Sequence, residues 1–397
     1  MLAFPEGRDG KMRWLLGILL VLVALATAGL VLGPGILESS LNRVEQASPP
    51  AAGDNARALH ATLDMVDLHA DTLLWGRDVL ERGTRGHVDV PRLVEGRFAV
   101  QVFSSVTKTP RGQNYDRNTG DTDSITLLAL INAWPARTWN SLTERAVFQA
   151  ERLQQAARTS PGAIMLLLRK EDIRTLMKAR AGGSSIVGGL LSTEGAHALE
   201  GRIENVQRLR DAGYRMIGLT HFFDNEVGGS LHGVSKEGLS PFGFQVIRAM
   251  EEAGIIVDLA HASEKTVSDV LHVATKPPLV SHTGVRGTCN SARNLSDETM
   301  KAIAAKGGLI GIGYWKGAVC DDTPDGVAKA IRYAVDLVGE DHVALGSDYD
   351  GSTTVTFDAS QTATLVDAML RAGLTADQVR KISGGNALRY LEANLPD

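Results

Sequence analysis

The sequence predicts an α/β protein whose main part is a (β/α)8 barrel of the TIM type, preceded by one N-terminal transmembrane helix. Three observations support this prediction. Short β-branched apolar runs alternate with longer helix-forming segments over roughly 300 residues, as in a parallel sheet covered by helices. Polar residues follow directly after many of these runs, where barrels carry their functional residues. An apolar stretch from Trp14 to Leu32 precedes all of them.

This apolar stretch is long enough to cross the ~30 Å hydrocarbon core of a membrane as a helix. Lys11 and Arg13 precede it, and basic residues before a span favour a cytoplasmic N-terminus. We therefore expect residues 1–13 to be cytoplasmic and residues 14–33 to be an uncleaved signal-anchor. The protein would then be a single-pass protein of the inner (cell) membrane, with its folded domain on the extracytoplasmic, periplasmic side.

A cleaved signal peptide is the alternative for this segment. Ala26 to Ala28 has the Ala-x-Ala shape of a cleavage site, although it lies inside the apolar stretch rather than after it. Residues 34–56 are expected to be a linker, because the stretch from Ala47 to Asn55 is rich in Ser, Pro, Ala and Gly. Residues 57–397 would then form the barrel domain.

The sequence contains nine apolar runs that could be strands, but a barrel has eight strand positions. One run is therefore an accessory strand or is not a strand. A doubly wound sheet is the runner-up fold. The candidate strands are Met65–Leu68, Phe98–Phe103, Ala163–Leu168, Ile186–Leu191, Met216–Leu219, Ile255–Leu259, Leu279–Ser281, Leu309–Ile312 and Val343–Leu345. The helices between them are expected over 57–63, 122–134, 142–157, 202–212, 241–253, 263–276, 296–306, 325–338, 360–371, 375–382 and 385–395.

Two successive β-α units each place a histidine just after the end of the strand. His261 follows the run Ile255–Leu259, and His282 follows the run Leu279–Ser281. Ser263 opens the helix between them as an N-cap residue. If the two strands are parallel neighbours, both imidazoles lie at the same end of the sheet.

Other strand candidates end in polar residues too. His69 and Asp71 follow the first run, two residues apart, so their side chains point the same way on an extended chain. The full set after strand ends is His69, Asp71, Glu194, His221, His261, His282 and Asp348. Imidazoles and carboxylates are the ligands of catalytic zinc, although manganese or iron would also accept them. The set exceeds the needs of one ion, so it predicts two ions, about 3.5–4 Å apart, that share a carboxylate and hold a hydroxide.

With these residues in place, the sequence resembles the membrane dipeptidase (renal dipeptidase) family of zinc hydrolases. The resemblance covers roughly Asp64 to Leu391 and leaves out the N-terminal segment. The matching pieces are His69-Ala-Asp71 with Leu74-Trp75, Glu194-Gly195-Ala-His197, Gly238-Leu-Ser-Pro-Phe-Gly243, Asp258-Leu-Ala-His261, Ser281-His282, Arg293-Asn294-Leu-Ser-Asp297, Gly346-Ser-Asp348-Tyr-Asp350-Gly351 and Gly384-Gly385-Asn386.

The resemblance implies a (β/α)8 barrel with two zinc ions per chain. It assigns His69 and Asp71 to one ion, His261 and His282 to the other, and Glu194 to both as a bridge. In Asp258-Leu-Ala-His261 an alanine stands where relatives often have serine, which leaves the ligand intact.

The same resemblance implies the reaction. His221 would contact the substrate and steady the oxyanion, Arg293 would pair with the terminal carboxylate, and Asp348 would move the proton. The substrates would be dipeptides, both L,L and L,D, and some relatives also open β-lactam rings. A disulfide between Cys289 and Cys320 is implied as well. The N-terminal helix would replace the C-terminal lipid anchor of the animal enzymes.

Two other function classes stay open at this point. One is a metal-dependent amidohydrolase for another small amide, lactam or lactone on the same barrel. The other is a binding protein that has kept the fold. A net charge of −5 argues against nucleic acid as a partner. The oligomeric state is open, with a homodimer as one arrangement.

Overall fold

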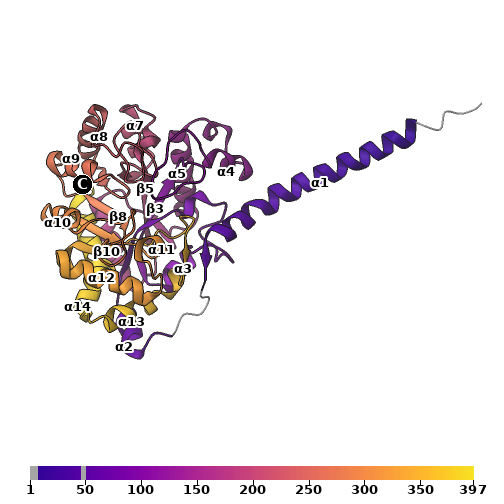
Figure 1. Ribbon diagram of the computed structural model, residues 1–397. Helices are drawn as coiled ribbons and strands as arrows, with labels where there is room; N and C mark the ends of the chain where they lie inside the picture. Colours follow the sequence, from indigo (N-terminus) through magenta and orange to yellow (C-terminus); the bar gives the residue numbers. More distant parts are fainter. Residues whose placement is uncertain (1–7, 46–50) are drawn as a thin grey trace, which may run out of the picture.

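The computed structural model describes the backbone of residues 8–45 and 51–397. Within the first range, the side chains of residues 13–21 and 32–45 are described. Figure 1 shows a barrel wrapped in helices, from which the long helix α1 (Arg8–Leu41) projects.

Eight parallel strands close the barrel. Their order is β3-β2-β10-β9-β8-β7-β6-β5, and the pairing of β3 with β5 completes the ring. The predicted barrel is therefore confirmed, and the doubly wound sheet is excluded. The strands are β2 (Met65–Ala70), β3 (Phe98–Val106), β5 (Val187–Glu194), β6 (Tyr214–Gly218), β7 (Ile256–Asp258), β8 (Leu279–Thr283), β9 (Leu309–Ile312) and β10 (Val343–Leu345).

The ninth candidate strand is accessory. β4 (Ile164–Leu166) pairs only with residues 187–189 of β5, while β6 takes residues 191–193 of the same strand. β4 therefore extends the sheet beside the ring without taking a position in it.

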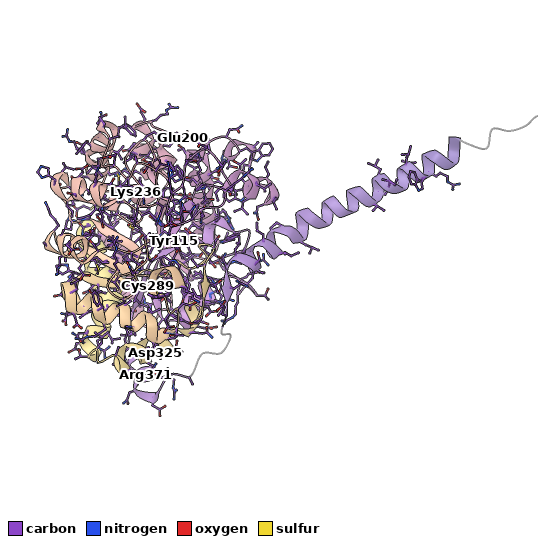
Figure 2. The ribbon with its side chains drawn as sticks, viewed as in Figure 1. Tyr115, Glu200, Lys236, Cys289, Asp325 and Arg371 are labelled. Atoms are coloured by element: carbon purple, nitrogen blue, oxygen red, sulfur yellow. A yellow bond between two sulfur atoms is a disulfide. The ribbon has the colours of Figure 1, made fainter. Side chains whose placement is uncertain are left out.

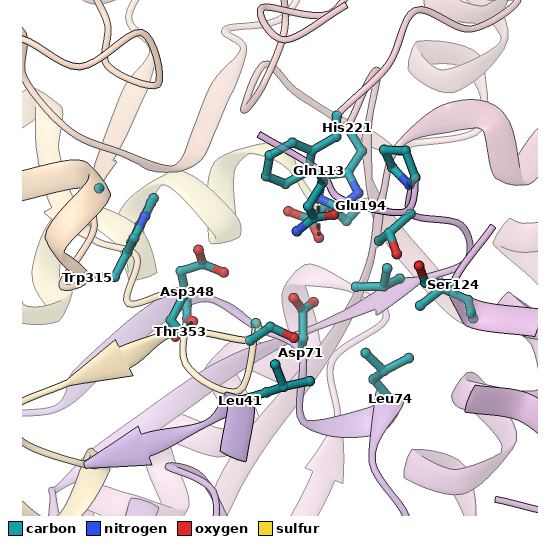
Figure 3. Close-up of a pocket in the computed structure, with 18 of the residues that line it drawn as sticks. Leu41, Asp71, Leu74, Gln113, Ser124, Glu194, His221, Trp315, Asp348 and Thr353 are labelled. Carbon is teal, nitrogen blue, oxygen red and sulfur yellow. Dashed lines mark hydrogen bonds and ion pairs between the residues drawn. The ribbon is translucent and has the colours of Figure 1, made fainter. Parts of the chain in front are cut away.

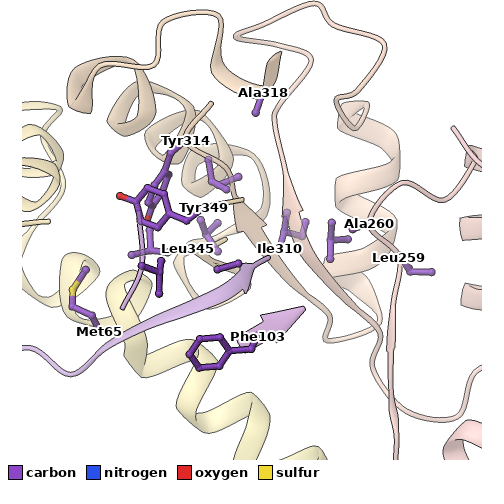
Figure 4. Packing of buried hydrophobic residues seen from close by; sticks show 14 of the residues in the cluster. Met65, Phe103, Leu259, Ala260, Ile310, Tyr314, Ala318, Leu345 and Tyr349 are labelled. Carbon is purple, nitrogen blue, oxygen red and sulfur yellow. The ribbon is translucent and has the colours of Figure 1, made fainter. Parts of the chain in front are cut away.

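The strands read as continuous apolar runs because both of their faces are covered. Every residue of β3 and of β5 is buried, as expected for parallel strands enclosed by helices. Figure 4 shows Met65, Phe103 and Ile310 among the packed side chains of this core.

Helices surround the barrel in the order expected for β/α units. The predicted N-caps at Ser263 and Ser296 are confirmed, since each side chain accepts a hydrogen bond from the amide three residues later. An exposed ion pair of 2.5 Å between Asp325 and Arg371 joins α12 to α13 (Figure 2). The helices are α2 (Asp54–His60), α3 (Val90–Glu95), α4 (Ile125–Ile131), α5 (Leu142–Thr159), α6 (Lys170–Ala181), α7 (Glu204–Asp211), α8 (Pro241–Glu252), α9 (Glu264–Val273), α10 (Asp297–Ala305), α11 (Lys316–Val319), α12 (Pro324–Val338), α13 (Ala363–Arg371), α14 (Ala376–Arg380) and α15 (Asn386–Asn394).

The linker predicted over residues 34–56 is wrong for its first part. Helix α1 continues to Leu41, and β1 (Arg43–Val44) then pairs in parallel with β11 (Thr354–Val355). The segment is fixed by tertiary contacts, because Glu38 is only 1% exposed and forms ion pairs with Arg77 and Arg85. Residues 46–50 of the predicted linker lie outside the described residues.

The predicted membrane span gains no support from the fold. Among the described residues, no helix combines the length and the apolar character that crossing a membrane requires. The side chains of residues 22–31, which belong to the predicted span, lie outside the described ones.

Candidate metal centre and substrate pocket

The predicted polar residues meet at the carboxyl ends of the barrel strands. β2 ends beside His69 and Asp71, Glu194 is the last residue of β5, and His282 lies near the end of β8. His221, His261 and Asp348 each stand three residues beyond the ends of β6, β7 and β10. The barrel therefore brings together all seven residues that the sequence predicts for this site.

Glu194 occupies the centre of this cluster. Its Oε1 lies 3.0 Å from His261 Nε2, 3.3 Å from His282 Nε2 and 3.6 Å from His69 Nε2. Its Oε2 lies 3.3 Å from His221 Nε2. One carboxylate thus faces four imidazoles that come from four different strands.

A second group of oxygens lies near the same nitrogen of His69. His69 Nε2 is 3.5 Å from Asp71 Oδ1 and 3.9 Å from Asp348 Oδ1. Figure 3 shows Asp71, Asp348 and Glu194 directed toward one another across the pocket. The potential ligand atoms of His69, Asp71 and Asp348 all lie within 4.8 Å of one another.

These residues fit metal ions. Ligand atoms that share a tetrahedral zinc at about 2.0–2.1 Å lie roughly 3.3 Å apart, and the separations around Glu194 are of that size. The Nε2 atoms of His261 and His282 face each other at 3.0 Å. His69 Nε2 and Asp71 Oδ1 are buried and have no hydrogen-bond partner among the described residues. Buried polar atoms without such partners are expected where a cation binds.

The carboxylates of the cluster are electrostatically crowded. Burial, reinforced by the charge of Asp71, raises the pKa of Glu194 well above its usual range. Burial also raises the pKa of Asp348 to about 8; the charge of His69 opposes this shift and that of Asp71 adds to it. Cations in the cluster would lower both values and restore the charged carboxylates.

The imidazoles are tuned toward the form that binds metals. Burial lowers the pKa of His221, His261 and His282 well below the usual value, so these rings are neutral. Burial would lower the pKa of His69 as well, but the nearby carboxylates of Asp71, Glu194 and Asp348 outweigh it and raise the pKa to about 10. A cation beside His69 would reverse that effect.

Two site residues have unusual backbone conformations. His261 has a φ of 62° and Asp348 a φ of 59°, in the left-handed region that non-glycine residues seldom adopt. The His261 carbonyl accepts a 2.7 Å hydrogen bond from the amide of Leu231, and the Asp348 amide donates to the His69 carbonyl at 3.2 Å. Such strained positions gather at functional sites, where the surrounding structure enforces them.

A layer of buried polar residues orients the cluster, and sequence reasoning missed it. Asp67 accepts hydrogen bonds of 2.7 Å from both the amide and the hydroxyl of Ser347. Ser281 Oγ lies 2.9 Å from His282 Nδ1, so it fixes the ring whose other nitrogen faces Glu194. The available signal was a single Asp or Ser inside an apolar strand, as for Asp67 and Ser281, or just after one, as for Ser347.

Arg293 lies against this cluster and is only 1% exposed. Its Nη2 donates to the His282 carbonyl at 2.9 Å, and the guanidinium stands 5.3 Å from the centre of the Trp315 ring. Its Nε is buried without a hydrogen-bond partner among the described residues. The side chain therefore keeps a donor free for an acidic group in the pocket.

Comparison with known proteins identifies the family. Residues 53–395 match the membrane dipeptidase family, peptidase family M19. The chain belongs to this family. It is therefore a hydrolase of the metallo-dipeptidase type, and the binding-protein alternative is set aside.

Individual relatives agree with the family assignment. Dipeptidase tcpJ of Claviceps purpurea is 27% identical over 315 residues, which cover 77% of this chain and 69% of the relative. The probable dipeptidase PvdM of Pseudomonas aeruginosa superposes with a TM-score of 0.71 at 18% identity, over 86% of this chain and 97% of PvdM. A metallo peptidase of Rhodobacter sphaeroides, solved with a phosphinate mimic of the dipeptide L-Ala-D-Ala, superposes with a TM-score of 0.67 at 23% identity. The match covers 84% of this chain and 99% of that protein. At these identities, the structures support the fold alone.

The predicted disulfide of this M19 protein is confirmed. Cys289 and Cys320 are bonded, with their Cα atoms 5.4 Å apart. The bond joins the loop after β8, which carries Arg293, to the segment after β9. The side-chain amide of Asn294 reinforces this junction, since its Nδ2 donates to the carbonyls of Cys289 and Ala318 at 2.8 and 2.7 Å.

The metal cluster forms the floor of a cavity of about 690 Å³. Three of its aromatic walls, Tyr115, Phe222 and Trp315, were not predicted from the sequence. Trp315 Nε1 donates to Tyr115 Oη at 2.8 Å, which ties together two loops that are 200 residues apart. Phe222 could have been found, because it directly follows His221; Tyr115 lies in a long polar loop without a pattern.

Proposed function

We propose that this M19 protein is a zinc-dependent dipeptidase with two zinc ions per chain, active on L,L and L,D dipeptides. In this proposal His69 and Asp71 hold one ion, and His261 and His282 hold the other. Glu194 serves both ions. The observation that carries the proposal is the position of Glu194 Oε1, within 3.6 Å of the Nε2 atoms of all three ligand histidines.

The chain's own residues divide the remaining work. When bound, the two ions would lower the pKa of a shared water and polarise the peptide carbonyl. His221 is neutral and buried, so its Nε2 can donate a hydrogen bond to the oxygen that gains negative charge. Asp348 takes the proton of the attacking water and passes it to the leaving amine. Arg293 binds the terminal carboxylate of the dipeptide.

The first test uses the full chain in detergent with a panel of L,L and L,D dipeptides. We expect cleavage that a chelator abolishes and that added zinc restores, with about two ions per chain by elemental analysis. A folded protein that carries two ions and cleaves no dipeptide would contradict the proposal. The substrate would then be another small amide, a lactam or a lactone.

Arg293 separates the dipeptide proposal from this alternative. We expect Arg293→Ala to raise KM for dipeptides about 30-fold or more, because a buried charge pair with the carboxylate is lost, while kcat changes little. The exposed Arg248→Ala in α8 is the matched control and should leave KM unchanged. An unaltered KM in Arg293→Ala would favour a substrate without a carboxylate.

We also propose that residues 14–33 anchor the protein in the cell membrane, with the barrel on the periplasmic side. Large apolar side chains of α1 support this, since Trp14, Leu15 and Leu20 are 70%, 61% and 69% exposed. A continuous apolar surface of this kind is unfavourable in water.

A further inference from the structure

The end of helix α1 and strand β1 reach the substrate cavity, although they precede the family region that starts at residue 53. Leu37, Leu41 and Glu45 line the same cavity as Asp71 and Glu194. We call residues 37–45 the N-terminal wall. The family match begins at residue 53, so it does not account for the contribution of this wall to the pocket.

A buried chain of charges holds the N-terminal wall in place. Glu38 is 1% exposed, and its carboxylate accepts hydrogen bonds from Arg77 Nε and, at 2.6 Å, from Arg85 Nε. Arg77 Nη2 in turn donates to Asp350 Oδ2 at 2.6 Å. Asp350 stands two residues after Asp348, so the wall is tied to the loop that carries a predicted catalytic group.

A short sheet provides a second attachment. Arg43 and Val44 pair in register with Thr354 and Val355, and the amide of Glu45 donates to the Val355 carbonyl at 2.8 Å. Residues 351–354 also line the cavity. The N-terminal wall is therefore attached at two points, Glu38 and β1, and is part of the folded domain.

Leu37 and Leu41 present an apolar surface to the cavity, whereas Glu45, the third wall residue that lines it, is charged. Leu37 is half-buried and packs against a cluster that includes Leu74, Ile125 and Leu128. Leu41 is 37% exposed and lines the same cavity as Leu74 and Asp71 (Figure 3). All of these leucines and Ile125 line the cavity.

The apolar surface and Arg293 lie on different sides of the metal cluster. Arg293 contacts His261 and His282, with Nη2 3.3 Å from His261 Nε2. The wall instead packs, through Leu37, against a cluster that contains Leu74, which stands three residues after Asp71; Figure 3 draws Leu41 and Leu74 below Asp71. A dipeptide whose carboxylate binds Arg293 and whose peptide bond lies over Glu194 therefore extends its N-terminal residue toward the wall.

We infer that the N-terminal wall determines specificity: Leu37 and Leu41, with Leu74, Ile125 and Leu128, form an apolar subsite for the side chain of the N-terminal residue of the dipeptide. This inference rests on the proposed dipeptidase function, which sets the orientation of the substrate. It adds a preference for large apolar N-terminal residues, such as leucine, over glycine.

The test measures kcat/KM of the full chain for Leu-Ala and Gly-Ala, and uses the ratio as the readout. We expect Leu41→Ala to lower the ratio several-fold and Leu37→Ala/Leu41→Ala to lower it about tenfold or more, because each methylene in an apolar pocket adds to discrimination. Gly-Ala cleavage should change little. Ile36→Ala is the matched control, since Ile36 lies on the same helix, 67% exposed and outside the cavity lining.

A second variant addresses the attachment of the wall. Glu38→Gln should also lower the ratio while zinc content persists, because the wall loses its ion pairs with Arg77 and Arg85. A ratio that stays at the wild-type value in Leu41→Ala and in the double variant would overturn the inference. Absence of any dipeptide cleavage by the wild type would instead overturn the proposed function, and this inference with it.

Discussion

At the scale of single residues, Glu194 concentrates the chemistry of the site. We expect Glu194→Gln to lose most of the bound metal and to lower kcat about 10³-fold or more, since an amide shares two cations poorly and leaves them undercompensated. Elemental analysis and dipeptide turnover measure both effects. The exposed Glu252→Gln in α8 is the control. A fully active, metal-loaded Glu194→Gln protein would refute the bridging role.

Asp350 gives a residue-scale prediction about pH. Burial alone would raise its pKa, but the charges of Arg77 and His87, with hydrogen bonds from the His87 backbone and the Thr72 side chain, outweigh burial and hold the pKa below its usual value. A carboxyl whose pKa is depressed on folding adds stability above its unfolded pKa of about 3.9, and this stability is lost as the pH falls through the folded pKa. The protein should therefore lose stability below about pH 4.

The variant Asp350→Asn isolates this contribution. At pH 7 it should lower the free energy of unfolding by about 3 kcal/mol, because the buried Arg77 loses one of its two carboxylate partners and keeps only Glu38. The difference from the wild type should shrink as the pH falls from 6 to 3, measured by urea unfolding. A difference that is constant over this range would show that the charge of Asp350 does not stabilise the fold.

Single site residues can be predicted from the sequence where a side chain able to bind a metal directly follows a strand. His261 and His282 could be found because each directly follows an apolar run, and parallel strands bring such positions together. Asp67 and Ser347 could not be found in this way, because their role depends on a contact across 280 residues. The same limit applies to Tyr115, whose place in the cavity is set by Trp315.

At the scale of elements, the disulfide fixes the loop that carries Arg293. It closes a separation of 31 residues, for which chain entropy predicts about 3–4 kcal/mol of stabilisation. We expect Cys289→Ser/Cys320→Ser to lower Tm and to raise KM for dipeptides, while zinc content stays the same. Calorimetry with and without a reductant gives the first effect. Two free thiols in the exported protein, with a Tm insensitive to reductant, would contradict this role.

Other elements show why pattern alone was insufficient. The run at Ala163–Leu168 has the pattern of a barrel strand. In the structure, β4 pairs only with the first part of one edge of β5, because β6 pairs with the rest of the same edge. The segment after the apolar N-terminal stretch reads like a linker, yet it is fixed by Glu38. The partners of Glu38 lie 39 and 47 residues further along the chain, beyond the reach of local patterns.

At the scale of the whole molecule, the barrel was predictable because its strands are buried on both faces and repeat in sequence order. The structure of the N-terminal segment was not predictable, since the two ends of one helix lie in different environments. Its first part is an apolar rod that projects from the barrel (Figure 1), and its last part is the N-terminal wall of the cavity. Shortened proteins should therefore separate the effects of these two parts on membrane binding and on substrate selection.

We expect the full chain to sediment with membranes and to stay there after a carbonate wash, because the apolar sequence from Trp14 to Leu32 is about as long as a membrane span. A protein that starts at residue 34 should be released in soluble form with an unchanged Leu-Ala to Gly-Ala ratio, since it keeps Leu37, Glu38 and Leu41. A protein that starts at residue 51 should be released as well, but with a lower ratio. A full chain that stays in solution without detergent would contradict the anchor. Equal ratios in the two shortened proteins would show that the helix end, although it lines the cavity, does not select the substrate.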